Sequence, residues 1–375
     1  MRYVDEYRDP ELAHGLTAEI RSLVAPGETV RVMEVCGGHT HAIYRHGLEE
    51  LLPPEVELVH GPGCPVCVIP MGRVDDAIAL AETGGLTLAT FGDMLRVPGG
   101  RGSLLEAKAR GADVRMVYSP LDALTLAGKE PGRHVAFLAI GFETTAPATA
   151  VTLLRARAEA VPNFSVFCNH VLIEPPLRAI LETPGLRVDA FIGPGHVSSV
   201  IGTDAYRFIC EEYRRPVVVS AFEPVDLLQS IAMILRQRAE GRCEVENQYT
   251  RVVRQEGNER ALAAIAKTME PREDFEWRGL GALPRSGLRI RDAFAAFDAE
   301  RLFALPDARI EDPKACRCGD VLTGQLRPWE CGVFGTACTP ERPLGTCMVS
   351  SEGACAAFFS YGRLRRPREE ASVGA

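Results

Sequence analysis

Eight short apolar runs recur between residues 30 and 240, and amphipathic stretches separate them. We expect these runs to be strands, at 30–35, 56–60, 86–91, 114–118, 135–140, 164–168, 188–192 and 216–221. We expect helices between them, at 72–83, 103–110, 146–160, 176–182, 204–214 and 224–239. Strands that alternate with helices form parallel sheets built from βαβ units. The pattern therefore predicts an α/β fold with its functional loops at the carboxyl ends of the strands.

A second signal is an internal repeat. The segment 60–70 (HGPGCPVCVIP) is similar to the segment 192–202 (IGPGHVSSVIG), and each Gly-Pro-Gly stands between a predicted strand and a predicted helix. Gly-Pro-Gly is also a common turn after a strand. We interpret the repeat as two Rossmann-like βαβ lobes with parallel sheets, at residues 1–125 and 126–245.

The chain changes character after Gly241. We expect helices at 258–270 and 290–305, and from Pro313 onward the sequence is rich in Cys, Gly and Pro. Six of the twelve cysteines stand in this last part, at positions 316, 318, 331, 338, 347 and 355. The sequence therefore predicts a third region at 246–375, mostly helical and irregular, that is organised by a metal.

The spacing of these six cysteines indicates the kind of metal site. It lacks the paired CxxC motifs of a zinc ribbon. Iron–sulfur clusters are held by four thiolates, and glycine-containing loops allow a chain to wrap around them. We therefore favour a [4Fe–4S] cluster over structural zinc, which makes the region an iron–sulfur domain. Four ligands leave two cysteines over, and these could form a redox pair.

Cys36 stands between a predicted strand and a predicted helix that begins HTHAIYRHG. A helix N-terminus stabilises a thiolate, so we expect a lowered pKa for this thiol. Gly37 and Gly38 allow a tight turn and the close approach of a ligand, and His39 is placed to reach the same space. The residues alone leave two interpretations open, a small buried cysteine and a reactive thiolate.

Cys64 and Cys67 form the motif GCPVC, which also lies between a strand and a helix. Such a pair is either a dithiol/disulfide couple or two metal ligands. Because parallel strands end at the same edge of a sheet, we expect Cys36 to lie near both. Three thiols with one uncovered side suit an open metal site, since closed zinc sites have four ligands.

Four further polar residues follow predicted strands: Asp93, Glu143, His170 and His196. Each alone is more often a helix cap or a hydrogen-bonded loop residue. Their common position makes them candidates for lining one cleft. In that cleft we expect Glu143 and His196 to face the first lobe from the second.

The composition excludes several classes of protein. The formal net charge of -8 argues against a general surface for binding nucleic acid or anionic membranes. No stretch reaches the roughly 18 apolar residues of a membrane span, and the charged N-terminus has no apolar signal segment. We therefore expect a cytoplasmic protein, and we interpret the basic cluster at 363–368 as a solvated tail. No strand is followed by a glycine-rich phosphate loop, so no nucleotide site is predicted.

Taken together, CGGHTH, GPGCPVC, GFETT, GPGHVS and the cysteine-rich segment resemble the HypD family of hydrogenase maturation proteins. The resemblance covers nearly the whole chain. It implies a metallocenter assembly scaffold with redox activity rather than a conventional enzyme. With a small HypC-type chaperone, such a scaffold builds the Fe(CN)2(CO) group of [NiFe]-hydrogenase. A HypE-type protein with HypF delivers the cyanide, and the finished unit passes to the hydrogenase large-subunit precursor.

The resemblance also implies roles for individual residues. Cys36, Cys64 and Cys67 match the family's essential cysteines at the iron-assembly cleft, and His39 matches a histidine beside them. The family's cluster ligands follow a C-x14-C-x6-C-x16-C pattern, which is matched by Cys316, Cys331, Cys338 and Cys355. The two cysteines left over are Cys318 and Cys347. A likeness of this arrangement to ferredoxin–thioredoxin reductase makes them the candidate redox pair.

Two other functions compete with the scaffold. One is a cluster-linked thiol-disulfide reductase that acts on another protein, and the other is a purely structural zinc protein. Metal analysis separates them, because iron with acid-labile sulfide excludes zinc alone, and iron beyond the cluster favours the scaffold.

Overall fold

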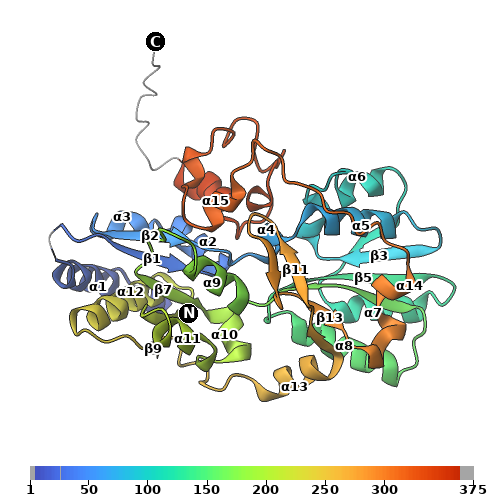
Figure 1. Ribbon diagram of the computed structural model, residues 1–375, viewed down its shortest axis with the longest axis horizontal. Helices are drawn as coiled ribbons and strands as arrows, with labels where there is room; N and C mark the ends of the chain where they lie inside the picture. The colour runs from blue at the N-terminus through green and yellow to red at the C-terminus, as the bar shows by residue number, and fades with distance from the viewer. Residues whose placement is uncertain (1–4, 26, 364–375) are drawn as a thin grey trace, which may run out of the picture.

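The computed structural model describes residues 5–25 and 27–363, and its centre is formed by two parallel sheets (Figure 1). Sheet A has the strand order β2-β1-β7-β8-β9, and sheet B has the order β4-β3-β5-β6. All neighbouring strands in both sheets are parallel. This is the α/β class that the alternation predicts. The strands are β1 (Val30–Glu34), β2 (Val56–His60), β3 (Leu86–Thr90), β4 (Val114–Met116), β5 (His134–Gly141), β6 (Phe164–His170), β7 (Ala190–Pro194), β8 (Val217–Ser220) and β9 (Val245–Asn247).

Sheet A is built from two separate parts of the chain. β1 and β2 precede sheet B in the sequence, whereas β7, β8 and β9 follow it. β1 pairs with both β2 and β7, so that Glu34 lies opposite His60 on one side and Ile192 on the other. The sheets therefore do not divide near residue 125, as the internal repeat led us to expect. Sheet B is inserted between β2 and β7 instead.

Helices cover both faces of each sheet. On sheet B, α7 and α8 lie against one face, and α5 and α6 lie against the other. On sheet A, α12 packs against β8 and is itself covered by α1. The longer helices are α1 (Pro10–Leu23), α2 (Gly37–His46), α5 (Met71–Ala81), α6 (Leu104–Ala109), α7 (Pro120–Lys129), α8 (Ala146–Ala158), α9 (Glu174–Leu181), α10 (Gly195–Ile201), α12 (Pro224–Ala239) and α13 (Glu259–Thr268). The short ones are α3 (Leu48–Leu51), α4 (Pro65–Val68), α11 (Arg207–Glu211), α14 (Ala299–Leu302), α15 (Cys318–Leu322) and α16 (Ala354–Ala357).

Local signals explain where several helices begin. Ser103 opens α6 with a capping box, in which its hydroxyl accepts from the Glu106 backbone N–H and the Glu106 carboxylate accepts from the Ser103 N–H. Asp9 caps α1 by accepting from the N–H groups of Glu11 and Leu12. Such caps satisfy backbone donors that a helix leaves without a partner.

The chain beyond α13 contains less helix than the mostly helical and irregular region that we expected. Two antiparallel ribbons form, β10 (Met269–Pro271) with β13 (Leu288–Ile290), and β11 (Asp274–Trp277) with β12 (Gly281–Pro284). The helix predicted at 290–305 is replaced by a 3-10 turn, η4 (Asp292–Phe297), and by α14. Asp298 separates them, because its side chain accepts from the Glu300 N–H and starts a new helix there.

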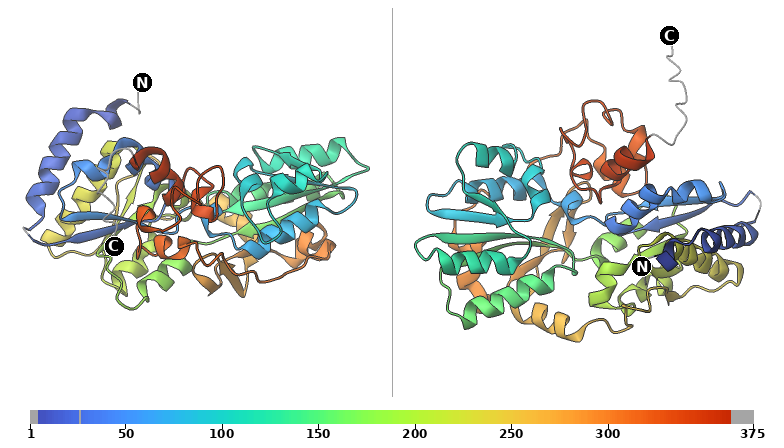
Figure 2. Two further views of the ribbon diagram at one scale, coloured as in Figure 1. Left: turned by 90° about the horizontal axis from the view of Figure 1, so that it is seen from above. Right: turned by 180° about the vertical axis from the view of Figure 1, so that it is seen from behind.

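The cysteine-rich region lies at the junction of the two sheets, where the three views of Figures 1 and 2 agree on its position. One apolar core joins the parts. It includes Leu138 of sheet B, Phe191 of sheet A, and the side chains of Cys67 and Cys347. No helix in residues 5–25 and 27–363 is long and apolar enough to cross a membrane. Residues 364–368 of the basic cluster lie outside the described part of the chain.

Candidate thiol and metal site

The loops after β1 and β2 lie directly against each other. The Gly37 N–H donates to the Gly63 carbonyl oxygen over 3.1 Å. A Cβ atom on Gly63 would lie 2.3 Å from the Cys36 nitrogen, which real Cβ atoms do not do. Gly63 is therefore required for the GPGC loop to reach Cys36, and the parallel pairing of β1 with β2 places both loops at one sheet edge.

Cys36 caps α2 with its backbone rather than with its thiol. Its carbonyl oxygen accepts from the N–H groups of His39 (2.8 Å) and Thr40 (3.1 Å). The thiol is buried, and its pKa is raised, first by burial and then by the carboxylates of Glu352 and Glu34. The N–H groups of Gly38 and His39 act in the opposite direction but do not outweigh burial. Our expectation of a lowered pKa for Cys36 is therefore wrong for the metal-free protein.

The buried carboxylate of Glu34 is hydrogen-bonded to the Cys36 loop. Glu34 has no exposed surface, and one of its oxygens accepts from the Cys36 N–H at 2.9 Å. The other oxygen accepts from the Thr40 hydroxyl and from His60 Nδ1, which is 2.7 Å away. The Tyr44 ring packs on the His60 ring with centroids 4.7 Å apart. Both oxygens of Glu34 are paired, which fixes the orientation of the loop, whereas His60 Nε2 has no hydrogen-bond partner among the described residues.

His39 and His196 both pack against one aromatic ring, that of Phe222. The centroid of Phe222 lies 4.9 Å from that of His39 and 3.9 Å from that of His196. His39 Nε2 donates to the Ser220 carbonyl oxygen over 3.1 Å, and burial lowers its pKa to about 4, so the ring is neutral at pH 7. A Cβ on Gly38 would touch both Phe222 and His196. The structure thus brings His196 close to the CGGHTH loop. Both follow strands of sheet A, His196 after β7 and the loop after β1.

Glu143 is buried and follows β5 of sheet B. One oxygen of Glu143 accepts from the Ile173 N–H at 3.0 Å, and the other has no hydrogen-bond partner among the described residues. Burial raises the pKa of Glu143 to about 7. The Tyr206 hydroxyl feels the charges of both Glu143 and Cys36, which raise its pKa after the larger effect of burial. Glu143 itself lines a pocket together with Glu174, Arg178 and Leu283, and none of the cysteines lines that pocket. A place for Glu143 in the thiol site therefore stays a prediction.

The two remaining polar candidates, Asp93 and His170, lie in different surroundings. Asp93 lies in η2 (Gly92–Arg96), close enough to Glu352 that its charge helps to raise the pKa of that carboxyl after burial does so. His170 is buried with both ring nitrogens paired, Nδ1 to the Gly141 carbonyl (3.2 Å) and Nε2 to the Thr149 hydroxyl (2.8 Å). Both ring nitrogens are thus satisfied by local hydrogen bonds, so that His170 is a hydrogen-bonded structural residue rather than one that lines the cleft.

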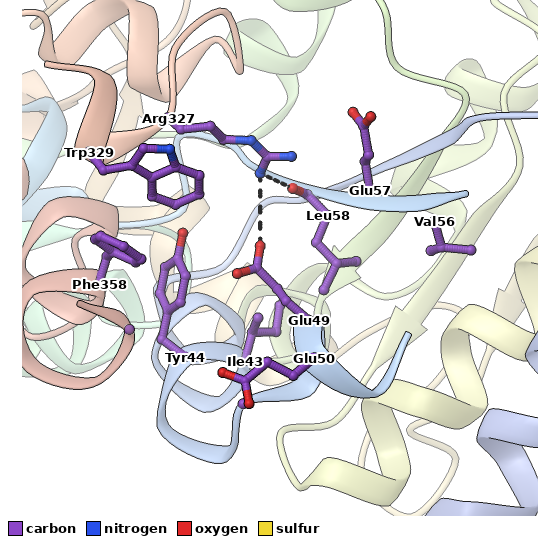
Figure 3. Close-up of a pocket in the computed structure, with 12 residues that line it drawn as sticks. Ile43, Tyr44, Glu49, Glu50, Val56, Glu57, Leu58, Arg327, Trp329 and Phe358 are labelled. Atoms are coloured by element: carbon purple, nitrogen blue, oxygen red, sulfur yellow. Dashed lines mark hydrogen bonds and ion pairs between the residues drawn. The ribbon is translucent and has the colours of Figure 1, made fainter. Parts of the chain in front are cut away.

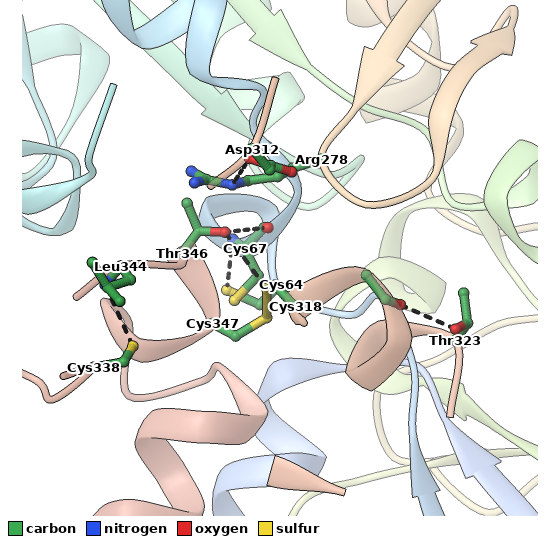
Figure 4. The surroundings of a disulfide bond; sticks show 11 residues. Cys64, Cys67, Arg278, Asp312, Cys318, Thr323, Cys338, Leu344, Thr346 and Cys347 are labelled. Carbon is green, nitrogen blue, oxygen red and sulfur yellow. Dashed lines mark hydrogen bonds and ion pairs between the residues drawn. A yellow bond between two sulfur atoms is a disulfide. The ribbon is translucent and has the colours of Figure 1, made fainter. Parts of the chain in front are cut away.

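Cys64 and Cys67 lie at the start and within the single turn of α4. The Cys67 N–H donates to the Cys64 sulfur at 3.3 Å, and burial, followed by Cys64, raises the pKa of Cys67. Figure 4 shows this pair next to a disulfide that joins Cys318 and Cys347. The Thr346 hydroxyl donates to the Cys67 carbonyl oxygen at 2.5 Å. The two cysteines left over by the resemblance are thus bonded to each other, beside the GCPVC motif.

The four candidate cluster ligands converge in the same region. They line one small cavity together with the disulfide: Cys316, Cys331, Cys338 and Cys355. The pKa of Cys355 is raised by burial and then by the other three thiols, as expected when four sulfur atoms share one space. A Cβ on Gly345 would lie 2.4 Å from the Cys316 sulfur, so this glycine leaves room for the thiol.

These thiols fit an iron–sulfur cluster by their chemistry, because four cysteine side chains line one cavity. In residues 5–25 and 27–363, however, no three His, Cys, Asp or Glu side chains lie close enough together to form a metal site. This holds for Cys36, Cys64 and Cys67 as well. That Cys36, Cys64 and Cys67 bind iron therefore stays a prediction.

The cysteine-rich region packs against β2, the edge strand of sheet A, and a separate pocket of about 270 Å³ lies where the two meet (Figure 3). Arg327 donates to the Leu58 carbonyl oxygen of β2 and lies 3.9 Å from the Glu49 carboxylate. Trp329 and Tyr44 each pack against Phe358, with ring centroids 4.5 and 5.4 Å apart. The pocket contains none of the cysteines, and its contacts hold the cysteine-rich region against β2.

Three charged residues of the site escaped the sequence analysis: Glu34, Glu352 and Arg278. Glu34 is the last residue of an apolar strand, and a carboxylate at that position is a visible anomaly. Glu352 approaches Gly37, since a Cβ there would lie 2.8 Å from its Oε2. Its nearness to Cys355 in the sequence is a weak signal. Arg278 has no distinctive sequence context, and its position follows from tertiary structure alone.

The family comparison agrees with this arrangement along the length of the chain. The model of the family described as "HypD: Hydrogenase formation hypA family" matches residues 11–362. The chain is 56% identical over 372 residues to the "Hydrogenase maturation factor HypD" of Rhizobium leguminosarum bv. viciae, which covers 97% of both chains. It is 52% identical over 367 residues to the protein of the same name from Escherichia coli (strain K12), which covers 96% of this chain and 98% of that one. The chain therefore belongs to the HypD family of hydrogenase maturation factors.

Proposed function

We propose that the chain is the scaffold on which, with a HypC-type chaperone, the Fe(CN)2(CO) group of a [NiFe]-hydrogenase is assembled. The observation that carries the proposal is the position of the Cys36 loop, which contacts the GPGC loop at Gly63 and lies against Glu352, Phe222 and His196. Gly37 and Gly38 allow these side chains to approach the loop closely. A soft thiolate suits iron that also carries cyanide and carbonyl.

Cys36 would hold the iron together with a cysteine of the chaperone. Before iron binds, the thiol would stay protonated, because burial raises its pKa. Binding iron therefore releases a proton, as metal binding to a thiol does in general. His39 is neutral at pH 7 and points to Ser220, so its part is to position Phe222 and the loop. Cys64 and Cys67 would either complete the ligand set or cycle between dithiol and disulfide.

In this proposal the cysteine-rich region carries out electron transfer and thiol-disulfide exchange. Cys316, Cys331, Cys338 and Cys355 would hold a [4Fe–4S] cluster, which exchanges one electron at a time. The Cys318–Cys347 disulfide lies between this set and α4, where Thr346 contacts Cys67. This placement supports thiol-disulfide exchange between the two cysteine pairs.

The remaining partners follow from the same proposal. A HypE-type protein with HypF would deliver cyanide, and the hydrogenase large-subunit precursor would receive the finished group. Assembly would take place in the cytoplasm, with no contact to nucleic acid or membrane.

Infrared spectroscopy of the complex with its HypC-type partner tests the scaffold. We expect bands of metal-bound cyanide and carbonyl in the native complex, and their loss in Cys36→Ala. Cys243→Ala, which removes a thiol far from the site in sequence and outside its cavities, serves as the control and should keep the bands. Bands of full intensity in Cys36→Ala would show that another residue holds the iron.

A second candidate function is a cluster-linked thiol-disulfide reductase. The contact between Thr346 and Cys67 favours it, because the disulfide lies within reach of the GCPVC pair. Turnover of a disulfide substrate by protein that carries no cyanide would support this function. Iron in excess of the cluster, accompanied by cyanide bands, would support the scaffold.

A further inference from the structure

Two cysteines outside the thiol and metal site, Cys210 and Cys243, meet at the β9 edge of sheet A, which is the edge opposite β2. The Cys243 sulfur lies 3.8 Å from the Cys210 carbonyl oxygen, and the Cys210 thiol donates to the Arg215 carbonyl oxygen at 3.2 Å. The Val217 N–H of β8 donates to the carbonyl oxygen of Glu244, the residue after Cys243, at 3.1 Å. The pairing of β8 with β9 therefore holds the two cysteines side by side, although they stand 33 positions apart.

Both cysteines line a cavity of about 510 Å³ at this edge. Its size is typical of sites for small molecules. The side chains of Arg207 and Glu244, which are 56% and 59% exposed, bring both signs of charge to its rim. Asn247 also lines it, and Asn247 Oδ1 has no hydrogen-bond partner among the described residues. The cavity therefore suits a small polar molecule that carries charges of both signs.

The two thiols differ in their access to such a molecule. Cys210 is 5% exposed, whereas Cys243 is half-buried. Burial, and then the neighbouring Cys243, raises the pKa of Cys210 to about 12, so that this thiol is protonated at neutral pH. A buried, protonated thiol reacts slowly with reagents from solution. We therefore expect a reagent that enters the cavity to react first with Cys243.

We propose that Cys243 is a modification site for small disulfides of the glutathione type, and that Cys210 converts the adduct into a Cys210–Cys243 disulfide. In the first step the Cys243 sulfur attacks one sulfur of the reagent, and the departing thiol takes the Cys243 proton. In the second step the Cys210 sulfur attacks the Cys243 sulfur, and the second thiol departs with the Cys210 proton. Two protein thiols lose two electrons and two protons, and the reagent disulfide becomes two thiols.

The fold favours closure of the pair over a lasting adduct. Because the chain already holds Cys210 beside Cys243, the second step is intramolecular and does not require another encounter. The raised pKa of Cys210 makes this step the slower of the two, so that the adduct precedes the disulfide. Neither residue belongs to the proposed iron site or to the candidate cluster ligands. The inference is therefore independent of the proposed function.

The test is incubation of the full chain, purified without oxygen, with mixtures of oxidised and reduced glutathione. Acid quenching, alkylation, tryptic digestion and mass spectrometry then report each thiol. Cleavage after arginine places the two cysteines on separate peptides, 208–214 and 243–251, and neither peptide contains another cysteine. We expect glutathione on the second peptide at early times, and a link between the two peptides in more than about half of the chains at equilibrium. Excess reduced glutathione should reverse the link.

Two variants separate the roles of the two thiols. Cys210→Ala should stop the reaction at the glutathione adduct of Cys243, and Cys243→Ala should leave Cys210 reduced. Cys168 is the internal control in every chain, because it is fully buried in sheet B, where its sulfur lies 3.9 Å from that of Met269. Its alkylation should occur only after unfolding in acid or denaturant, which also shows that each variant is folded.

The native chain alone is able to overturn the inference. If its peptides 208–214 and 243–251 never become linked, Cys210 does not resolve the adduct. If Cys243 gains no glutathione in Cys210→Ala, it is not a modification site. A glutathione adduct on Cys210 in Cys243→Ala, formed as fast as that on Cys243 in the native chain, would contradict the order of the two steps.

Discussion

The Thr346 hydroxyl lies 2.5 Å from the Cys67 carbonyl oxygen, and this hydrogen bond joins residues that are 279 positions apart. Thr346 is buried and is followed directly by Cys347 of the disulfide. The bond therefore ties the disulfide segment to the GCPVC helix. Both partners are neutral, so the tie is not weakened by salt or by pH.

Thr346→Val tests how much this hydrogen bond stabilises the docking of the cysteine-rich region. Valine keeps the shape but leaves the Cys67 carbonyl without its partner, so the free energy of unfolding should fall by about 1–2 kcal/mol. Thr346→Ser should recover most of it. Thr336→Val is the control, because the exposed Thr336 hydroxyl bonds only locally to Val333. Urea unfolding measures all three, and an equal effect of both valine variants would contradict the assignment.

Gly345→Ala should impair loading of the cluster without unfolding the α/β part. The added methyl group would lie 2.4 Å from the Cys316 sulfur and force that thiol out of the shared cavity. Iron and acid-labile sulfide per chain should drop to less than about half. Gly332→Ala adds the same group next to Cys331 in open space and should load normally. Full loading of Gly345→Ala would exclude Cys316 as a ligand held in this position.

Glu34→Gln should destabilise the Cys36 loop. The carboxylate accepts from the Cys36 N–H, from Thr40 and from His60, whereas an amide presents a donor to one of them. We expect a loss of about 2–3 kcal/mol in the free energy of unfolding, since hydrogen bonds to a buried charge are strong.

Glu57→Gln is the matched control for that change. Glu57 lies on the neighbouring strand, and its side chain is 37% exposed and paired with Arg31. Its loss should cost less than about 0.5 kcal/mol, because exposed ion pairs contribute little. If chemical denaturation gave the same midpoint for both variants, the network around Glu34 would have no special weight.

Glu143 predicts a pH dependence of stability. Its pKa in the folded chain is about 7, raised by burial from 4.5. The folded state therefore binds the proton more tightly, and the resulting stability is present below pH 4.5 and is lost as the pH rises through 7. The contribution is of the order of 3 kcal/mol. In Glu143→Gln this fall should be absent, so the difference between the two curves isolates it.

Glu174→Gln, at the rim of the same pocket, is the control for this measurement, because its side chain is 51% exposed. Thermal unfolding across the range from pH 4.5 to above 7 provides the curves. A difference curve for Glu143→Gln that rises with falling pH no more than that for Glu174→Gln would contradict a buried, protonated Glu143.

The strands were predictable from the sequence, and the connection between the lobes was not. All eight expected runs form strands, because most of their apolar residues are buried and turns separate the runs. Period and burial carry no information on which strand becomes the neighbour of β1. The pairing of β1 with β7 is decided by packing between parts of the chain about 160 residues apart. The short strand β9, with three half-buried residues, gives too weak a pattern to detect.

The site was partly predictable for the same reason. Cys36, Cys64 and His196 follow strands, so the edge of sheet A collects them. His170 also ends a strand, but two local hydrogen bonds turn its ring inward. Glu34, Glu352 and Arg278 act through burial and through neighbours that only the folded chain supplies. The expected low pKa of Cys36 failed because helix position is visible in the sequence and desolvation is not.

The insertion of sheet B between β2 and β7 has a consequence for synthesis of the chain on the ribosome. Cys36, Cys64 and Cys67 leave the ribosome about 130 to 160 residues ahead of His196, and Glu352 is made far later still. At 5–20 residues per second, β1 and β2 wait on the order of ten seconds for β7, the next strand of their sheet. During that interval the three thiols lack the cover that later parts of the chain, such as Glu352, supply. In the nascent chain, Cys36, Cys64 and Cys67 are therefore more accessible to unintended metals and oxidants than they are in the folded protein.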